Sequence, residues 1–519
     1  MHSLATLDHR YLWHPFTQMR DWLQREPIVI VSGKGSVLRD VHGKEYLDAN
    51  ASIWTNLHGH SHPKINAAIR KQLQKVAHSS ALGLANEPAS LLGEALVQAT
   101  HLDLPKVFFS DDGSTALEVA LKLAYECARR TGRSRTPRFL SLEGAYHGDT
   151  VGAVSLGHID LFHKAYAGLL FASDQVMAPY CYRCPFNRAK PARADARQTR
   201  QCHSECLGKV EQCLARQKKK GQPYAAMVVE PVLQGAAGMI PQPAGWLRAV
   251  ATLLRDHGAQ LIADEVMTGF GRLGTAALQH RTSLGHSTGL EEDALSLRER
   301  VRVRGKQTAF DPKGDDSFSA KPEARSLLPP LFACDREGVR PDFLAVAKGL
   351  TGGYLPMAAT LTTQEVFDAF LGDYADFKTF FHGHSFTANQ LGSAAALASL
   401  ELLQAQRSLR ARQGLEQVLR AELPSLWALP NVGDIRQEGL VAGIELVKDW
   451  RTRQPFDLRD QAGLRVCAEM ARRGVLTRPI GNVIPLLPPY CTSPDQAVQM
   501  VAVLKQAVQT VLGSRKQPQ

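Results

Sequence analysis

The 519-residue sequence has no run of about 18 consecutive apolar residues, the length that a membrane-spanning helix requires. Residues 1–15 lack a basic segment followed by a long apolar one, so we expect no signal peptide. Nine cysteines are few for this length, and without a secretory signal they indicate reduced thiols rather than a disulfide framework. No internal repeat is visible. We therefore expect a cytoplasmic globular protein with more than one domain.

A uniformly basic composition is also missing, although the net charge is +11. Residues 180–222 hold eleven Lys/Arg and three Asp/Glu, a net charge of +8. Residues 276–330 hold nine Lys/Arg and eight Asp/Glu, a net charge of +1. Only +2 is left for the rest of the chain. Because the basic character belongs to one segment, we expect neither a nucleic-acid partner nor a membrane partner.

Short apolar runs alternate with helical patterns through the middle of the chain. The runs lie at 138–144, 225–232, 260–266 and 342–348. Residues 107–130 add an apolar strand, a polar turn and a long amphipathic helix. Continuous apolar strands separated by helices predict an α/β fold with a mostly parallel central sheet that is buried on both faces.

Further structure is predicted on either side of this pattern. Residues 37–49 indicate two strands around a His42-Gly43 turn, and Pro63 opens a helical pattern. From about residue 370, long helices alternate with strands such as 439–447. We expect an N-terminal segment that contributes to the small domain and the active site, a large domain, and a smaller C-terminal α/β domain. Their predicted bounds are 1–60, 61–369 and 370–519, with insertions at 180–222 and 276–330.

Lys348 and Asp264 carry the clearest chemical signal. Each falls at the end of an apolar run, and Lys348 is followed by the glycine-rich turn GLTGG. Pyridoxal 5'-phosphate (PLP) needs an amine with which to form an imine, and a carboxylate that keeps its pyridine nitrogen protonated. A lone lysine after a strand is more often a surface residue. A lysine and an aspartate after neighbouring strands, however, favour a PLP site.

Three further positions near strand ends fit this cofactor or an ordinary structural role. Gly113 and Ser114 begin a helix, where backbone N–H groups favour a phosphate, although serine is also a common N-cap. Tyr146, in GAYHGDT, is placed to stack on the pyridine ring or only to cover the end of the sheet. Glu230 ends the next strand and is either a carboxylate of the cofactor pocket or a structural one.

Two later segments are candidates for phosphate and substrate binding. His384 and Ser385, in FFHGHSF, precede a strong helical pattern, so Ser385 suits a phosphate or simply the N-cap region. Arg478 is followed by a proline and could clamp a substrate carboxylate with two hydrogen bonds, although a single arginine is more commonly solvated.

Five of the nine cysteines fall in the basic segment 180–222. They are Cys181, Cys184, Cys202, Cys206 and Cys213. Paired cysteines separated by a loop can bind zinc or an iron–sulfur cluster, but the spacing of a usual zinc finger is missing. We therefore favour reduced thiols without a metal, and a metal site at these cysteines stays open.

Longer strings give a resemblance to a known family. DEVMTGFGR at 264–272 and AKGLTGGYLPMAA at 347–359 resemble the signature of the class III aminotransferases, which are fold type I PLP-dependent transferases. Within this class the chain is most similar to the 7,8-diaminononanoate synthase family. That similarity is carried by LWHPFTQM (12–19), SIWTNLHGHSHP (52–63), GAYHGDTVGAVS (144–155) and VGDIRQEGLVAGIEL (432–446).

The resemblance implies a function in biotin synthesis, the conversion of 8-amino-7-oxononanoate to 7,8-diaminononanoate with S-adenosylmethionine as the amino donor. It also implies a homodimer with shared active sites. Catalytic roles would fall on Lys348, Asp264 and Tyr146. Cofactor-binding roles would fall on Gly113, Ser114, Tyr146, Glu230, Asp264, Lys348 and His384. Ser385 of the partner subunit would also bind the cofactor. Substrate-binding roles would fall on Phe16, Trp54, Arg272, Gly383 and Arg478, with Arg478 on the acceptor carboxylate and Arg272 recognising the donor.

Two positions depart from the family pattern. Phe16 stands where many members that use S-adenosylmethionine have a tyrosine, and Ile53 stands where they have a second tryptophan beside Trp54. At these points the chain resembles a branch that uses lysine as the donor, because contacts suited to a large adenine-bearing cation are lost. Two further functions are compatible with the same fold: a class III aminotransferase acting on an ω-amino acid, and a non-catalytic scaffold.

Residues 276–330 interrupt the family pattern, which resumes on both sides. They are polar, mixed in charge and without sustained apolar periodicity. Because long insertions in surface loops cost little closure entropy, we expect a surface loop that is dispensable for catalysis.

Overall fold

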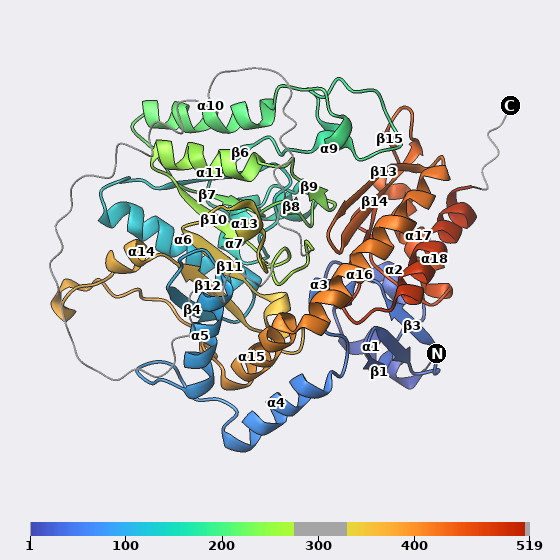
Figure 1. Cartoon of the computed structure of the whole chain (residues 1–519), viewed down its shortest axis with the longest axis horizontal. Helices are drawn as coiled ribbons and strands as arrows, with labels where there is room; N and C mark the ends of the chain where they lie inside the picture. Colours follow the sequence, from blue (N-terminus) through green and yellow to red (C-terminus); the bar gives the residue numbers. More distant parts are fainter. Residues whose placement is uncertain (1, 275–329, 514–519) are drawn as a thin grey trace. The chain divides into compact units, whose positions relative to one another are not determined.

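A seven-stranded sheet lies at the centre of the computed structural model, which describes residues 2–274 and 330–513 (Figure 1). Its strands, in spatial order, are β4 (Lys106–Ser110), β12 (Ala358–Thr362), β11 (Phe343–Val346), β10 (Gln260–Asp264), β7 (Tyr224–Val229), β5 (Arg138–Leu142) and β6 (Asp174–Val176). Neighbouring strands pair in parallel, except that β12 is antiparallel to β4 and β11. The mostly parallel sheet is thus confirmed, and each predicted run overlaps an observed strand.

Both faces of this sheet are buried, because alternate side chains of each strand enter different cores. In β10, Leu261 and Ala263 belong to one core and Ile262 to the other. The Ile262 face is covered by α6 (Gly113–Arg130), α7 (Val151–Leu156) and α14 (Gln364–Asp368). The opposite face is covered by α5 (Glu87–Ala99), α10 (Glu205–Lys219), α11 (Trp246–His257) and α15 (Gln390–Gln404).

Two smaller sheets are built from the ends of the chain. One contains β13 (Val432–Glu438), β14 (Val441–Asp449), β15 (Gln454–Pro455) and β17 (Val483–Leu486), with α16 (Gln406–Glu422), α17 (Ala462–Arg472) and α18 (Pro494–Leu512) nearby. The other contains β1 (Ile30–Lys34), β2 (Val37–Asp40), β3 (Glu45–Asp48) and β16 (Val475–Leu476). Because β16 pairs with β3, the N-terminal segment shares a sheet with the C-terminal part (Figure 1).

The remaining elements are short or lie at the edges. They are α1 (Ser3–Tyr11), α2 (Met19–Leu23), α3 (Ala51–Trp54), α4 (Pro63–Lys75), α8 (Asp160–His163), α9 (Ala196–Thr199), α13 (Ala333–Glu337) and the β8 (Leu233–Gln234) and β9 (Ile240–Pro241) pair. The described residues form one compact unit, so the domain boundaries at 60/61 and 369/370 stay predictions. Within the described chain, no helix is both long and apolar enough to cross a membrane.

The two predicted insertions differ in the structure. The one at 276–330 lies outside the described residues except for Pro330. The basic segment 180–222 does not form a surface excursion throughout, because α10 buries Val210 and Leu214 in the main core. The many basic residues of the segment give it a polar composition, so its apolar helix face was not predicted. Val210 and Leu214 are nevertheless spaced by one helical turn, as an apolar face requires.

Gly439 marks a close contact between the β13–β14 turn and the segment after β10. Its φ is +58°, and a Cβ there would lie 2.0 Å from the carbonyl carbon of Leu273. The following N–H, of Leu440, donates to the carbonyl of Arg272 at 2.9 Å. Only glycine fits, because both the backbone conformation and the space exclude a side chain.

Gly439→Ala should therefore lower the free energy of unfolding by about 2–4 kcal/mol, through overpacking and a left-handed alanine. The matched control is Gly43→Ala. Gly43 also has positive φ (+81°), but it has open space around it, so we expect a loss of about 1 kcal/mol. Urea unfolding followed by intrinsic fluorescence measures both. Equal losses in the two variants would show that the contact with Leu273 is unimportant.

Candidate active site

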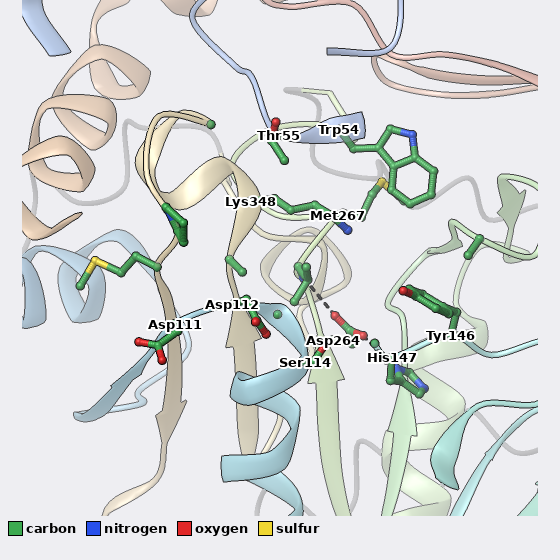
Figure 2. Close-up of a pocket in the computed structure, with 18 of the residues that line it drawn as sticks. Trp54, Thr55, Asp111, Asp112, Ser114, Tyr146, His147, Asp264, Met267 and Lys348 are labelled. Atoms are coloured by element: carbon green, nitrogen blue, oxygen red, sulfur yellow. Dashed lines mark hydrogen bonds and ion pairs between the residues drawn. The ribbon is translucent and has the colours of Figure 1, made fainter. Parts of the chain in front are cut away.

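The register of two parallel strands brings Lys348 and Asp264 together. In the β10–β11 pair Asp264 lies opposite Ala345, three residues before Lys348. The carboxyl ends of parallel strands meet at one edge of a sheet, where α/β proteins bind their ligands. Both side chains line one cavity of about 420 Å³, as Figure 2 shows. The sequence-based pairing of these two residues thus has a geometric counterpart.

Lys348 occupies a strained and largely apolar position. Its φ is +41°, an uncommon value for a residue with a side chain, and such strain clusters at functional sites. Its Nζ lies 4.9 Å from the centre of the Trp54 ring. Burial lowers the pKa of Lys348 and nearby Arg272 lowers it further, whereas Asp264 and Glu230 oppose the shift. A lowered pKa leaves more of the neutral amine, which is the nucleophile.

Asp264 is held by a histidine for which the sequence indicates no role. His147 Nδ1 lies 2.8 Å from Asp264 Oδ2, and the N–H of Val266 donates to Oδ1 at 3.1 Å (Figure 2). The His147 side chain is fully buried. The pair fixes the aspartate so that it can face a ligand in the cavity. The only sequence signal was the position of His147 beside Tyr146 after a strand.

The start of α6 lies at one corner of the cavity. The first N–H groups of a helix have no partner within it, and its dipole favours a phosphate there. Gly113 and Ser114 line the cavity at this point. A Cβ on Gly113 would lie 2.7 Å from Val266 Cγ1, so glycine is required for the close packing of helix and strand end. Ser114 Oγ accepts from the N–H of Asp149 at 3.2 Å.

Tyr146 and Glu230 complete the wall opposite the helix. The Tyr146 hydroxyl donates to Asp149 Oδ2 at 2.7 Å, and burial raises the pKa of Tyr146. Glu230 is buried, and its Oε2 accepts from the N–H of Gly235 at 2.7 Å. Burial raises the pKa of Glu230 to about 7. The tyrosine ring and the carboxylate both line the cavity, as the sequence predicted for a cofactor pocket.

Trp54 reaches the cavity from an unusual turn. Ala51, Ser52, Ile53 and Trp54 all have positive φ, from +43° to +68°, so α3 is a left-handed turn without glycine. Arg272 supports this turn, because its guanidinium donates to the carbonyls of Trp54 (3.4 Å), Asn56 (2.9 Å) and Pro488 (3.0 Å). Arg272 is not among the residues that line the cavity, and its predicted contact with the amino donor stays a prediction.

Several predicted residues lie outside the cavity lining. Arg478 is exposed and donates to the carbonyl of Phe16, and the Phe16 ring lies 5.2 Å from that of Phe162. His384 Nδ1 lies 3.1 Å from Asp111, which does line the cavity. Gly383 and Ser385 are exposed. Lining residues that the sequence did not single out include Thr55, Asp112, Ala236, Met267, Tyr354 and Met357.

The five cysteines of segment 180–222 are free thiols, and Cys181 and Cys206 are buried. In residues 2–274 and 330–513, no group of three or more His, Cys, Asp or Glu side chains is arranged to hold a metal ion. Burial raises the pKa of Cys181 to about 12 and that of Cys206 to about 11, so these thiols are unreactive at neutral pH.

Comparison with known proteins identifies the family. The family described as Aminotransferase class-III matches residues 19–284 and 330–508. The chain belongs to this family. The matched range 19–284 includes the segment 180–222, whereas 285–329 is left unmatched, and the two insertions stay predictions.

Relatives of this class-III aminotransferase are similar over nearly the whole chain. Adenosylmethionine-8-amino-7-oxononanoate aminotransferase of Geobacter sulfurreducens is 42% identical over 98% of both chains. The protein of that name from Nitratidesulfovibrio vulgaris is 43% identical over 97% of this chain and 81% of its own. The crystal structure of that of Methanocaldococcus jannaschii has a TM-score of 0.81 at 34% identity, covering 98% of this chain and 99% of that one. Family membership confirms the predicted fold, reaction class and PLP cofactor.

The residues present fit this cofactor. The lysine amine, the Asp264–His147 pair, the Tyr146 ring and the start of α6 match its aldehyde, pyridine nitrogen, ring face and phosphate. These role assignments are predictions that rest on position and chemistry.

Lys348→Ala should leave the fold intact but abolish turnover, because the variant lacks the amine that anchors the cofactor and moves the proton. Borohydride treatment of the wild type followed by peptide mapping should label Lys348. The control is Lys122→Ala, which removes an exposed lysine near His382 and should keep full activity. Labelling of any lysine other than Lys348 would contradict the assignment.

Proposed function

We propose that this chain converts 8-amino-7-oxononanoate to 7,8-diaminononanoate in biotin synthesis, with S-adenosylmethionine as the amino donor. The observation that carries the proposal is the full-length similarity to aminotransferases named for that donor and acceptor, at 37–43% identity in five relatives. The cavity, with its lysine and aspartate, supplies the chemistry that such a transfer needs.

Each of the cavity residues would have its own role in the amino transfer. Bound PLP would supply an aldehyde and an electron-accepting ring. Lys348 would bind the aldehyde and, once released, carry the proton between substrate and cofactor carbons at its Nζ. Asp264, oriented by His147, would keep a proton on the pyridine nitrogen. Tyr146 would cover the ring, and Gly113 and Ser114 would hold the phosphate.

A second cavity beside the first is suited to the long acceptor. It has a volume of about 460 Å³ and shares Ala236 with the first. Its lining includes Leu161, Phe162 and Ile480, apolar side chains that match an aliphatic chain. Arg478 lies two residues before Ile480, and we propose that it binds the terminal carboxylate. Burial lowers the pKa of Arg478, but an arginine remains charged at neutral pH.

The donor assignment has a specific competitor in lysine. Phe16 contributes no hydroxyl and packs edge-on against Phe162 at 5.2 Å, and Ile53 is about half exposed, at 48%. These two side chains offer an adenine-bearing donor fewer polar and aromatic contacts than tyrosine and tryptophan would. S-adenosylmethionine stays the first proposal because the relatives are named for it.

We further propose a cytoplasmic homodimer. Two loops, at residues 82–84 and 381–386, expose large apolar side chains, and Ser385 lies in the second loop. The side chains are Leu82 (92%), Leu84 (62%), Phe381 (76%) and Phe386 (59%). A group of large apolar side chains exposed on the surface of one chain indicates a protein–protein interface. In the dimer, Gly383 and Ser385 would reach the phosphate and substrate of the partner subunit. The free thiols agree with a reducing compartment.

Half-reaction spectroscopy tests the proposed function. S-adenosylmethionine should convert the cofactor to its aminated form, with loss of the visible absorbance, and 8-amino-7-oxononanoate should restore it. Lysine offered in the same way separates the two donors. If 4-aminobutyrate or ornithine drives the first step and 8-amino-7-oxononanoate does not restore absorbance, the chain belongs with the class III ω-aminotransferases.

Arg478→Ala should raise the KM of the acceptor by about tenfold or more and change the donor half-reaction far less. The reason is the loss of a charge-assisted contact, worth about 1.5–3 kcal/mol, with the acceptor carboxylate. Arg459→Ala is the control, because Arg459 is also exposed and pairs with Asp457 away from the cavity lining. Equal damage to both half-reactions would show that Arg478 is structural, through its bond to Phe16.

A further inference from the structure

Glu230 has a carboxylate oxygen that the described structure leaves unused. Its Oε2 accepts from the N–H of Gly235 at 2.7 Å, whereas Oε1 is buried and forms no hydrogen bond of good geometry with the described residues, although the backbone N–H of Tyr146 also stabilises the carboxylate. The residue is only 6% exposed and lines the candidate active-site cavity. A buried polar atom without a partner is costly and calls for a ligand or a special role.

The surroundings of Glu230 define one side of the cavity. A Cβ built on Gly235 would lie 3.0 Å from Met267 Cε, 3.4 Å from the Trp54 ring and 3.6 Å from Glu230 Oε2. The carboxylate therefore shares a corner with an indole ring and a thioether. Such a corner attracts a cation, which the carboxylate pairs with and the indole face also stabilises.

Two basic residues near Glu230, His147 and Lys348, are not hydrogen-bonded to it. His147 is hydrogen-bonded to Asp264 at 2.8 Å. Lys348 acts on Glu230 electrostatically but forms no hydrogen bond with it, and in the acceptor half-reaction its Nζ would carry the transferred proton. Bound PLP would add an anionic phosphate, and Asp264 would hold its protonated ring nitrogen. Among the described residues no basic side chain forms an ion pair with Glu230, so its carboxylate is open to a cation of the substrate.

We infer that Glu230 binds the ammonium group on the carbon next to the reacting carbonyl of the acceptor. The inference rests on the proposed function and assigns a substrate class to it: ketones that carry a neighbouring amine, and the vicinal diamines made from them. In 8-amino-7-oxononanoate this group is the 8-ammonium. Arg478 and Glu230 would then hold opposite ends of the acceptor, by its carboxylate and its ammonium.

This arrangement makes Glu230 a specificity-determining residue. A site that is built to pair a substrate cation rejects an analogue without it, because the buried carboxylate then stays unpaired. The analogue is 7-oxononanoate, which keeps the chain, the carboxylate and the reacting carbonyl. The wild type should therefore react with 8-amino-7-oxononanoate much faster than with 7-oxononanoate.

Glu230→Gln is the decisive variant, since glutamine keeps the size and can still accept from Gly235. The wild-type protein with aminated cofactor is mixed with each ketone, and the single-turnover rate is read from the returning absorbance. We expect a preference of about 10- to 100-fold for the amino ketone, from the usual strength of a hydrogen bond to a charged group. In Glu230→Gln the preference should fall to near one. The control is Glu94→Gln, an exposed carboxylate on α5 that lines neither cavity, which should keep the preference.

A binding measurement covers the case in which Glu230→Gln does not fold. Borohydride-reduced wild-type holoenzyme cannot react, and calorimetry should show tighter binding of 8-amino-7-oxononanoate than of 7-oxononanoate by about the same factor. Equal binding of the two ketones, an unchanged preference in Glu230→Gln, or an equal loss of rate with both ketones would overturn the inference. If the wild type converts neither ketone, the proposed function itself fails, and this assignment with it.

Discussion

The parallel pairing of β10 with β11 is the constraint on which the candidate active site depends. Its register sets Asp264 opposite Ala345, so the lysine three residues later must emerge at the same edge of the sheet. Apolar side chains on both faces of these strands keep this register, because a slip by one residue would exchange the two cores. The chemistry at the edge is thus maintained by packing well below it.

The sequence allowed prediction of those parts that are encoded locally. Continuous apolar runs predicted the central strands, and the ends of two of them predicted the Lys348–Asp264 pair. The supporting contacts of Arg272 could not be predicted, because its partners at Trp54 and Pro488 are more than 200 residues away in sequence. In segment 180–222 the abundant basic residues obscured the buried face of α10. The part played by His147 depends on a tertiary contact with Asp264 that no local pattern encodes.

A buried charge network connects segment 180–222 with the C-terminal sheet and the cavity. Arg436 donates to Asp434 (2.9 Å), to Glu445 (2.6 Å) and to the carbonyl of Gly238, in the loop that follows Gly235. Glu445 in turn accepts from Arg183 at 2.7 Å. Removing one member would leave a buried charge unpaired, which usually costs about 3–5 kcal/mol. The loop beside Glu230 is therefore fixed from outside the cavity.

The left-handed turn at Ala51–Trp54 has a consequence for the order in which the protein assembles. The left-handed backbone of each residue is about 1–2 kcal/mol higher in conformational energy than a right-handed one, so the turn is not stable by itself. It is held by Asp48, which accepts from Ser52, and by the distant Arg272. The wall that carries Trp54 can therefore form only after residues 48–54 have met Arg272, which follows the central strand β10. Tight cofactor binding then reports that folding is complete, since a partly folded chain would present the lysine without an enclosed cavity.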